Sequence, residues 1–218
     1  MSRRTRGIRP GGLLPRLCAL AALLLALPGC LTDGSIPVGG NGGTGVLRGV
    51  VAHAEDPDLP FSQARITVRS AAGYLAERIA DPWGRFEIAN VPDGLLEVTF
   101  EGAEPGRFLP VRILAHAQYA SYSTIAVLLE PARLAQPDVT AVRVSPREVK
   151  TTVGQKVAFS AAITGGNPRR QAPSWVLEGG IGSVTPRGEF RALHPGTGTL
   201  IAIAGGVSDA VTITVTAP

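Results

Sequence analysis

The 218-residue chain carries 21 basic and 17 acidic residues, but five of its arginines lie within the first 29 residues. Without that segment, 16 basic residues stand against 17 acidic ones, a net charge of −1. This balance excludes the basic surface that a nucleic-acid-binding protein needs, so we expect no nucleic-acid partner.

The first 29 residues have the pattern of an export signal rather than of a folded segment. The five arginines come first, without any acid, and an apolar stretch follows from Leu17 to Leu27. These eleven residues are too few to span a bilayer, which takes roughly 20 apolar residues. Residues 1–29 are therefore predicted to be a signal peptide.

The end of this segment, Leu27-Pro28-Gly29-Cys30, resembles the lipobox of bacterial lipoproteins, although Pro28 departs from the commonest pattern. The resemblance implies cleavage before Cys30 and lipid attachment, with palmitate among the acyl chains, to its thiol. The alternative is an ordinary secretory signal that contains a cysteine. With Leu31 after the cysteine, the resemblance implies a place in the cell envelope: the outer membrane if the organism has one, otherwise the outer face of the cell membrane.

Cysteine chemistry is limited to this anchor. Cys18 would leave with the signal peptide and Cys30 would carry lipid, so the exported chain has no thiol for a disulfide or a metal site. His53, His116 and His194 form no ligand-spaced cluster, and no nucleophile elbow or phosphate-binding loop occurs. We therefore predict a protein without metal or cofactor that is not an enzyme.

The exported chain begins with a Gly-rich stretch and continues in strands. Residues 30–45 show no hydrophobic period, which predicts a flexible tether. Residues 46–131 alternate apolar and polar side chains with period two, which is typical of half-buried strands. Within them, Leu114–Gln118 fits either a strand or a single helical turn.

The segment 132–138, which follows Pro131 and contains Pro137, is predicted to link this part to a second all-β part, residues 139–218. Regular turn signals there favour a sandwich. Each part has large candidates for a core of its own, so we expect two domains that fold alone, with few contacts across the boundary. These core candidates are Phe86 and Phe100 in the first part and Phe159 and Trp175 in the second.

Residues 46–131 resemble the carboxypeptidase regulatory-like domain, a transthyretin-like β-sandwich. The matching segments are Gly49-Val50-Val51, Pro60–Ile66, Asp81–Phe86 and Val91–Leu96, in the family's order and spacing. Leu96 departs from the family, which more often has an aromatic residue there. In the Asp81–Phe86 turn we expect Asp81 to accept backbone N–H groups, Gly84 to adopt positive φ and Phe86 to enter the core.

Residues 139–216 resemble the bacterial immunoglobulin-like domains of group 2, which occur in adhesins, intimins and polysaccharide-associated proteins. The matching residues are Val144-Ser145-Pro146, Val153–Phe159, Trp175, Gly188–Ala192 and Pro195–Ile201. Together the two resemblances imply an all-β chain of two consecutive β-sandwich domains after a signal peptide and a flexible tether.

Binding sites are only weakly indicated. Trp83, at the tip of a turn, is a candidate to stack on a sugar ring or to enter a partner's pocket; the alternative is that it folds back over its own sandwich. Tyr119 and Tyr122 are further stacking candidates, and a flat row of exposed rings would favour a sugar ligand. The acidic loop Glu55–Asp58 has the oxygen ligands that Ca²⁺ takes, or is simply solvated.

Charge is divided unevenly between the two parts. Residues 46–131 have a net charge of −4, residues 138–218 have +3, and Arg169-Arg170 adds a local basic point. This asymmetry can orient the two parts, attract an acidic polysaccharide or belong to ordinary solvated surface. The function that we predict is a non-enzymatic envelope lipoprotein that serves as a binding, adhesion or spacer module, with a protein or polysaccharide of the envelope as partner. A carbohydrate-binding accessory lipoprotein is the alternative.

Overall fold

The described part of the chain consists of strands, turns and loops, and no helix occurs in it. The computed structural model describes residues 45–132, 138–167, 169–170 and 172–218. The predicted signal peptide, Cys30 with most of the tether, and most of the predicted linker lie outside the described residues.

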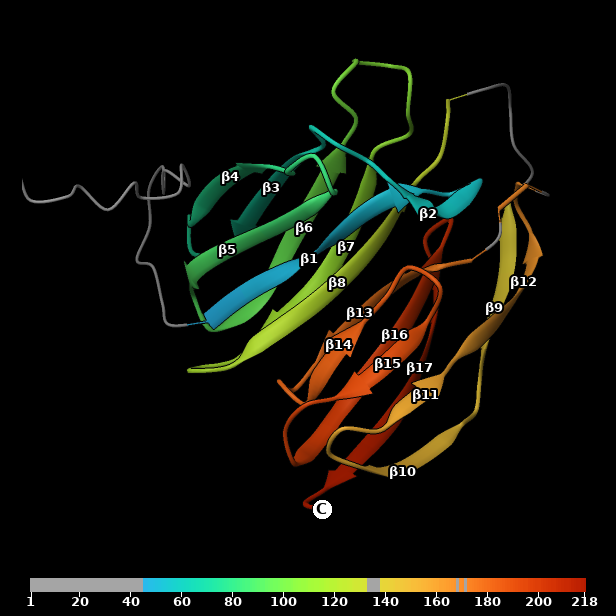
Figure 1. The fold of residues 1–218 in the computed structure, drawn as a ribbon. Helices are drawn as coiled ribbons and strands as arrows, with labels where there is room; N and C mark the ends of the chain where they lie inside the picture. The colour runs from blue at the N-terminus through green and yellow to red at the C-terminus, as the bar shows by residue number, and fades with distance from the viewer. Residues whose placement is uncertain (1–44, 133–137, 168, 171) are drawn as a thin grey trace, which may run out of the picture. The chain divides into compact units, whose positions relative to one another are not determined.

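The first half of the described chain forms two sheets with a common core (Figure 1). In one sheet, β1 pairs with β8 in parallel and with β5 and β2 in antiparallel orientation. The other sheet has the order β4-β3-β6-β7. The strands are β1 (Gly45–His53), β2 (Asp56–Pro60), β3 (Arg65–Ser70), β4 (Leu75–Ile79), β5 (Arg85–Val91), β6 (Gly94–Glu101), β7 (Val111–Ala117) and β8 (Tyr122–Leu129).

The predicted core aromatics of this half are confirmed. Phe86 is 6% exposed and Phe100 is fully buried, and their rings meet edge to face at 5.5 Å. The segment Leu114–Gln118, for which the sequence allowed either a strand or a helical turn, belongs to strand β7 up to Ala117. Its small buried alanines, Ala115 and Ala117, gave a weak apolar period, which is why the sequence did not decide between the two.

The second half forms a further sandwich. Its main sheet has the order β10-β17-β16-β13, and it is covered by the sheet β11-β15-β14 and by the pair β12-β9. Trp175, 1% exposed, and Phe159, 3% exposed, lie in its core as predicted. The strands are β9 (Val139–Ser145), β10 (Glu148–Thr152), β11 (Lys156–Ala158), β12 (Ser160–Gly165), β13 (Ser174–Glu178), β14 (Gly182–Val184), β15 (Glu189–Ala192), β16 (Gly196–Ala204) and β17 (Val207–Thr216).

One sheet runs through both halves. Strand β8 of the first half pairs antiparallel with β13 of the second, with Ala126 opposite Trp175 and Ile125 opposite Val176. Eight strands therefore belong to a single sheet, which follows the path β10-β17-β16-β13-β8-β1-β2, with β5 attached to β1 (Figure 1).

This junction is buried on both faces of the sheet. Every residue of β8 from Ser123 to Leu129 is buried. Ile125 and Val127 contribute to the first core and Ala126, which points the other way, to the second, whereas Val176 of β13 contributes to the first core. Side chains alternate across a strand, so a strand covered on both faces needs apolar residues at successive positions.

The two sandwiches of the predicted fold class are present, but the expectation that few contacts cross their boundary is wrong. The described residues from Gly45 to Pro218 belong to one compact unit. The physical reason lies in the uninterrupted apolar runs Ile125–Leu129 and Trp175–Leu177, which lack a polar face. Each run needs cover on both sides, and the other half supplies part of it.

Candidate functional site

Trp83 is held at the tip of a tightly fixed turn between β4 and β5. The Asp81 carboxylate accepts the N–H groups of Trp83 at 2.9 Å and of Arg85 at 2.7 Å, as the sequence predicts. Gly84 has φ +72°, and a Cβ there would lie 2.2 Å from the carbonyl oxygen of Val51. The indole is 63% exposed, so the alternative in which it folds back over its sandwich is wrong.

A groove of about 810 Å³ adjoins this turn. The first half lines it with three arginines, two acidic side chains and Thr124, and β14 of the second half adds Ser183 and Val184. Guanidinium groups match the geometry of carboxylates, and hydroxyl groups both donate and accept, so this lining suits a polar ligand with anionic groups. The charged residues of the lining are Arg48, Arg78, Arg85, Asp81 and Glu87.

The second half contains an equivalent turn, Thr185–Gly188. The Thr185 hydroxyl accepts the N–H of Glu189 at 3.1 Å, and the N–H of Gly188 donates to the Thr185 carbonyl at 2.9 Å, as Gly84 does to Asp81. Gly188 has φ +82°. The residue at the tip is Arg187, which corresponds to Trp83.

The side chain of Arg187 has a partner within the chain. Its Nε and one terminal nitrogen donate to the two carboxylate oxygens of Asp58 at 2.6 and 2.5 Å. The hydrogen bond from Arg187 holds the pKa of the Asp58 carboxyl below its ordinary value. Because Asp58 lies on β2, this ion pair joins the two halves at the surface.

The acidic loop that the sequence offered as a calcium site is engaged in ion pairs of this kind. Glu55 lies 3.8 Å from Arg169, and Asp58 pairs with Arg187. Within the part of the chain that the structure describes, no three side chains of His, Cys, Asp or Glu gather as a metal site would require.

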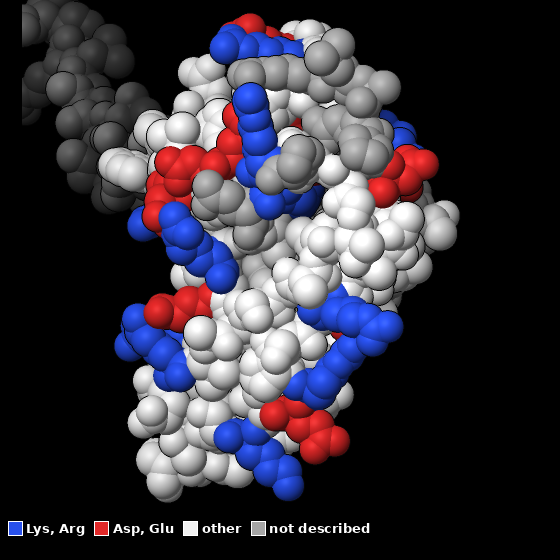
Figure 2. Space-filling model, turned by 90° about the vertical axis from the view of Figure 1, so that its right-hand side faces the viewer, with Lys and Arg blue, Asp and Glu red and all other residues white. Residues whose placement is uncertain are grey.

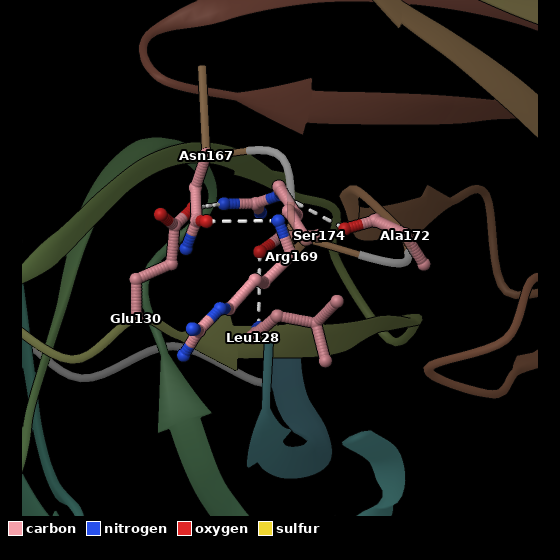
Figure 3. Close-up of polar contacts among 7 residues, drawn as sticks. Leu128, Glu130, Asn167, Arg169, Ala172 and Ser174 are labelled. Carbon is pink, nitrogen blue, oxygen red and sulfur yellow. Dashed lines mark hydrogen bonds and ion pairs between the residues drawn. The ribbon is translucent and has the colours of Figure 1, made fainter. Parts of the chain in front are cut away.

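A third ion pair between the halves is buried. Figure 3 shows Glu130, at the end of β8, beside the loop that carries Asn167, Arg169 and Ala172. The carboxylate of Glu130, whose side chain is 12% exposed, pairs with the guanidinium of Arg170, which is 6% exposed. Burial lowers the pKa of Arg170 to about 10.

Further hydrogen bonds support this loop and the strand next to it. The Nε of Arg170 donates to the Ala172 carbonyl at 2.8 Å. Nearby, the N–H of Leu128 donates to the Ser174 hydroxyl at 3.0 Å, which adds a link between β8 and β13 (Figure 3).

All three of these pairs join an acid of the first half to an arginine of the second. The predicted charge asymmetry thus serves, in these pairs, to hold the two halves together. Figure 2 shows basic and acidic side chains interspersed on one face of the molecule, without a large area of one sign.

The aromatic side chains proposed for sugar stacking do not form a flat row. Tyr119 is 76% exposed, but it lies in the turn after β7, beside the beginning of β1. Trp83 lies near the other end of β1, since Arg85, two residues after it, pairs with Val50. Tyr122 is partly buried, with the Arg48 guanidinium 3.8 Å from its ring centroid and the His194 ring at 6.0 Å.

The histidines are also separated, as the sequence suggested. His53 packs against Phe61 and Phe108 at ring distances of 4.7 and 5.7 Å, and burial lowers its pKa. His116 is exposed on β7, and its backbone N–H donates to the Glu178 carboxylate at 2.7 Å.

Two features of the site were missed at the sequence level. The equivalence of the two turns is visible as the repeated pattern x-Pro-x-Gly-x-Phe in Asp81–Phe86 and Thr185–Phe190. The pairing of Glu130 with Arg170 has no such signal, because the two residues are far apart in the sequence.

Cys30, the predicted lipid-attachment residue, lies outside the described residues. Within residues 45–132 and the described positions of 138–218, no helix has the length and hydrophobicity that a membrane crossing needs.

Comparisons with known proteins bear on the second half. The search of curated proteins found no match. Among solved structures, the chain is similar to Sidekick-1 immunoglobulin domains 1–4, with 18% sequence identity and a TM-score of 0.24, over 84% of this chain and 48% of that one. It thus spans about half the length of that structure, and a TM-score this low carries no argument. Residues 138–215 match the family model of the bacterial Ig-like domain, group 2.

Proposed function

We propose that this protein is a non-enzymatic lipoprotein of the bacterial cell envelope, anchored through lipid on Cys30, whose β-sandwiches serve as a binding, adhesion or spacer module. The observation that carries the proposal is the sheet shared by the two halves, reinforced by the buried pair of Glu130 and Arg170. Such a junction resists bending between the sandwiches, which a spacer or a module for presenting a ligand-binding surface requires.

The surface available for a partner supports the same proposal. Trp83 is exposed on a turn whose backbone is fixed by Asp81 and Gly84, so little backbone entropy is lost when the indole enters a partner's pocket. Bacterial Ig-like domains often mediate binding or adhesion, and residues 138–215 match that family.

The anchor is tested with the two cysteines of the chain as a matched pair. Cys30→Ala is expected to abolish incorporation of labelled palmitate and to leave the protein unprocessed or released from the membrane fraction. Cys18→Ala, within the predicted signal peptide, should be lipidated and membrane-bound like the natural protein. Equal labelling and fractionation of both variants would overturn the lipid anchor. In an organism with two membranes, we expect the protein in the outer one.

A carbohydrate-binding accessory lipoprotein is the second candidate, favoured by the arginine-lined groove beside the exposed Trp83. It predicts retention of a uronate-containing polysaccharide, loss of that retention in Trp83→Ala and Arg85→Ala, and no change in Arg112→Ala, which lies outside the groove. Equal retention of a neutral polysaccharide, or an unaffected Arg85→Ala, would contradict a site for acidic sugars.

A further inference from the structure

Exposed apolar side chains gather at the end of the first sandwich where β1 begins. This end, called the tether end below, consists of Gly45, Val91–Leu95 and Ala117–Tyr122. The register brings these segments together, because Gly45 pairs with Val91 and Gly94 pairs with Ala117. In addition, the N–H of Val46 donates to the carbonyl of Ser121 at 3.0 Å.

Two large side chains of the tether end are turned to solvent. Leu95 is 59% exposed and Tyr119 is 76% exposed. Tyr119 stands in a turn closed by a hydrogen bond from the Ser121 N–H to the Gln118 carbonyl, with Ala120 in the left-handed region at φ +52°. Leu114, 57% exposed, lies on the same face of β7 as His116, which is paired with Leu95.

Few charged side chains lie at this end. Asp93 is the only acidic residue within Val91–Leu95 and Ala117–Tyr122, and the Glu178 carboxylate lies next to them, where it accepts the backbone N–H of His116. The guanidinium of Arg48, which lies over the Tyr122 ring, adds a cation beside it. Tyrosine and leucine suit the interfacial region of a bilayer, where an aromatic ring is buried and its hydroxyl stays hydrated.

The length of chain before β1 identifies the surface that this end meets. Fourteen residues separate Cys30 from Gly45, and even fully extended they reach only about 50 Å. A lipid on Cys30 would therefore keep the tether end close to the bilayer at a high effective concentration, at which a contact too weak to bind vesicles by itself is occupied.

We propose that the tether end rests on the membrane that holds the protein, with Leu95 and Tyr119 in the interfacial region. This inference rests on the proposed lipid anchor. It gives the first sandwich a direction relative to the bilayer. Trp83 lies two residues before Arg85, which pairs with Val50, and Val50 is about 17 Å along β1 from Gly45. The turn of Trp83 then stands away from the bilayer, where a partner can reach it.

The chain offers a matched pair of fluorescent positions to test this orientation. The full-length lipidated protein is reconstituted into vesicles of phosphatidylethanolamine and phosphatidylglycerol that contain nitroxide-labelled phospholipid. One sample keeps the natural Trp83, and the other carries Trp83→Phe with Tyr119→Trp. Trp175, 1% exposed, is the same background in both.

We expect several-fold stronger quenching of the indole at position 119 than of that at position 83. Leu95→Asp, added to the position-119 sample, should reduce this quenching, whereas Leu109→Asp should not, because Leu109 lies near the other end, where its N–H donates to the Glu130 carbonyl. Equal or absent quenching at both positions, in protein that floats with the vesicles, would overturn the orientation and leave the anchor standing. Protein that does not float with the vesicles would overturn the anchor, and this inference with it.

Discussion

The turns Asp81–Arg85 and Thr185–Glu189 have the same backbone design in different halves of the molecule. In each, a side-chain oxygen at the first position accepts a backbone N–H four residues on, a proline follows, and a glycine with positive φ precedes a strand whose phenylalanine is buried. They differ at the tip, where Trp83 is 63% exposed and Arg187 pairs with Asp58 across the junction.

This difference shows how one local structure serves two purposes. The backbone of the turn is determined by the oxygen acceptor, the proline and the glycine, so the tip residue is free to vary without loss of the turn. In the second half an arginine at that position contributes to holding the halves together. In the first half a tryptophan stays available to a partner, which is the basis of the proposed binding surface.

The largest effect on stability is expected at the buried ion pair of Glu130 and Arg170. Glu130→Ala would leave the Arg170 guanidinium buried and unpaired, which costs about 3–5 kcal/mol of unfolding free energy. Urea unfolding measures the loss. Asp58→Ala, which removes the partner of the exposed Arg187, is the control and should change the midpoint far less. Equal losses for the two variants would show that burial does not distinguish these pairs.

Substitution of the turn glycines is expected to have the next largest effect on stability. Gly84→Val and Gly188→Val each force a β-branched residue to positive φ, at a cost of about 1–3 kcal/mol. Both should fall at the upper end of that range, because a Cβ would lie 2.2 Å from the Val51 carbonyl oxygen or 2.5 Å from that of Phe159. Gly73→Val measures the cost of the positive φ alone, without a steric clash, since nothing lies within 4 Å of its added Cβ.

The same variants test whether the halves unfold together. In a Trp83→Phe background, Trp175 reports from the second core, so Gly84→Val in the first half should lower the urea midpoint that Trp175 reports. An unchanged Trp175 midpoint would show that the shared sheet does not make the halves one cooperative unit.

Removal of the side-chain acceptor at the first position of each turn should cost less stability. Asp81→Ala removes a carboxylate that accepts two N–H groups, whereas Thr185→Ala removes a hydroxyl that accepts one. We expect losses of about 1–2 kcal/mol for Asp81→Ala and about 0.5–1 kcal/mol for Thr185→Ala, measured by thermal unfolding. A larger loss for Thr185→Ala would refute the equivalence of the two turns.

The smallest effects on stability are expected at the tips. Trp83→Ala should change the unfolding free energy by about 0.5 kcal/mol or less, because the indole is mostly exposed. Arg187→Ala should have a small effect that disappears in high salt. Because the folded-state pKa of Asp58 is lowered, the contribution of this pair is present at neutral pH and is lost as the pH falls through the range in which Asp58 becomes protonated. A strong, salt-independent loss in Arg187→Ala would contradict this description.

Much of the local structure was predictable from the sequence. Period-two alternation identified the half-buried strands, and the buried Phe86, Phe100 and Phe159 follow from it. The buried Trp175 lies in an apolar run without alternation, and its place in the core was implied by the resemblance to immunoglobulin-like domains. The acceptor role of Asp81 and the positive φ of Gly84 follow from turn chemistry that acts within five residues. The sequence did not decide whether Trp83 is exposed, because a side chain at the tip of a turn can point into solvent or pack back against the sandwich.

What the tertiary structure alone decided is how the halves meet. The apolar runs Ile125–Leu129 and Trp175–Leu177 show in the sequence that both faces of β8 and β13 need cover, but not that these strands pair with each other. The partners of Arg170 and Arg187 could not be predicted either, since an ion pair leaves no local pattern when its residues lie 40 or 129 positions apart. Periodicity and turn chemistry are local properties of the chain, whereas strand order and long-range charge pairing depend on which surfaces remain to be covered once the local structure has formed.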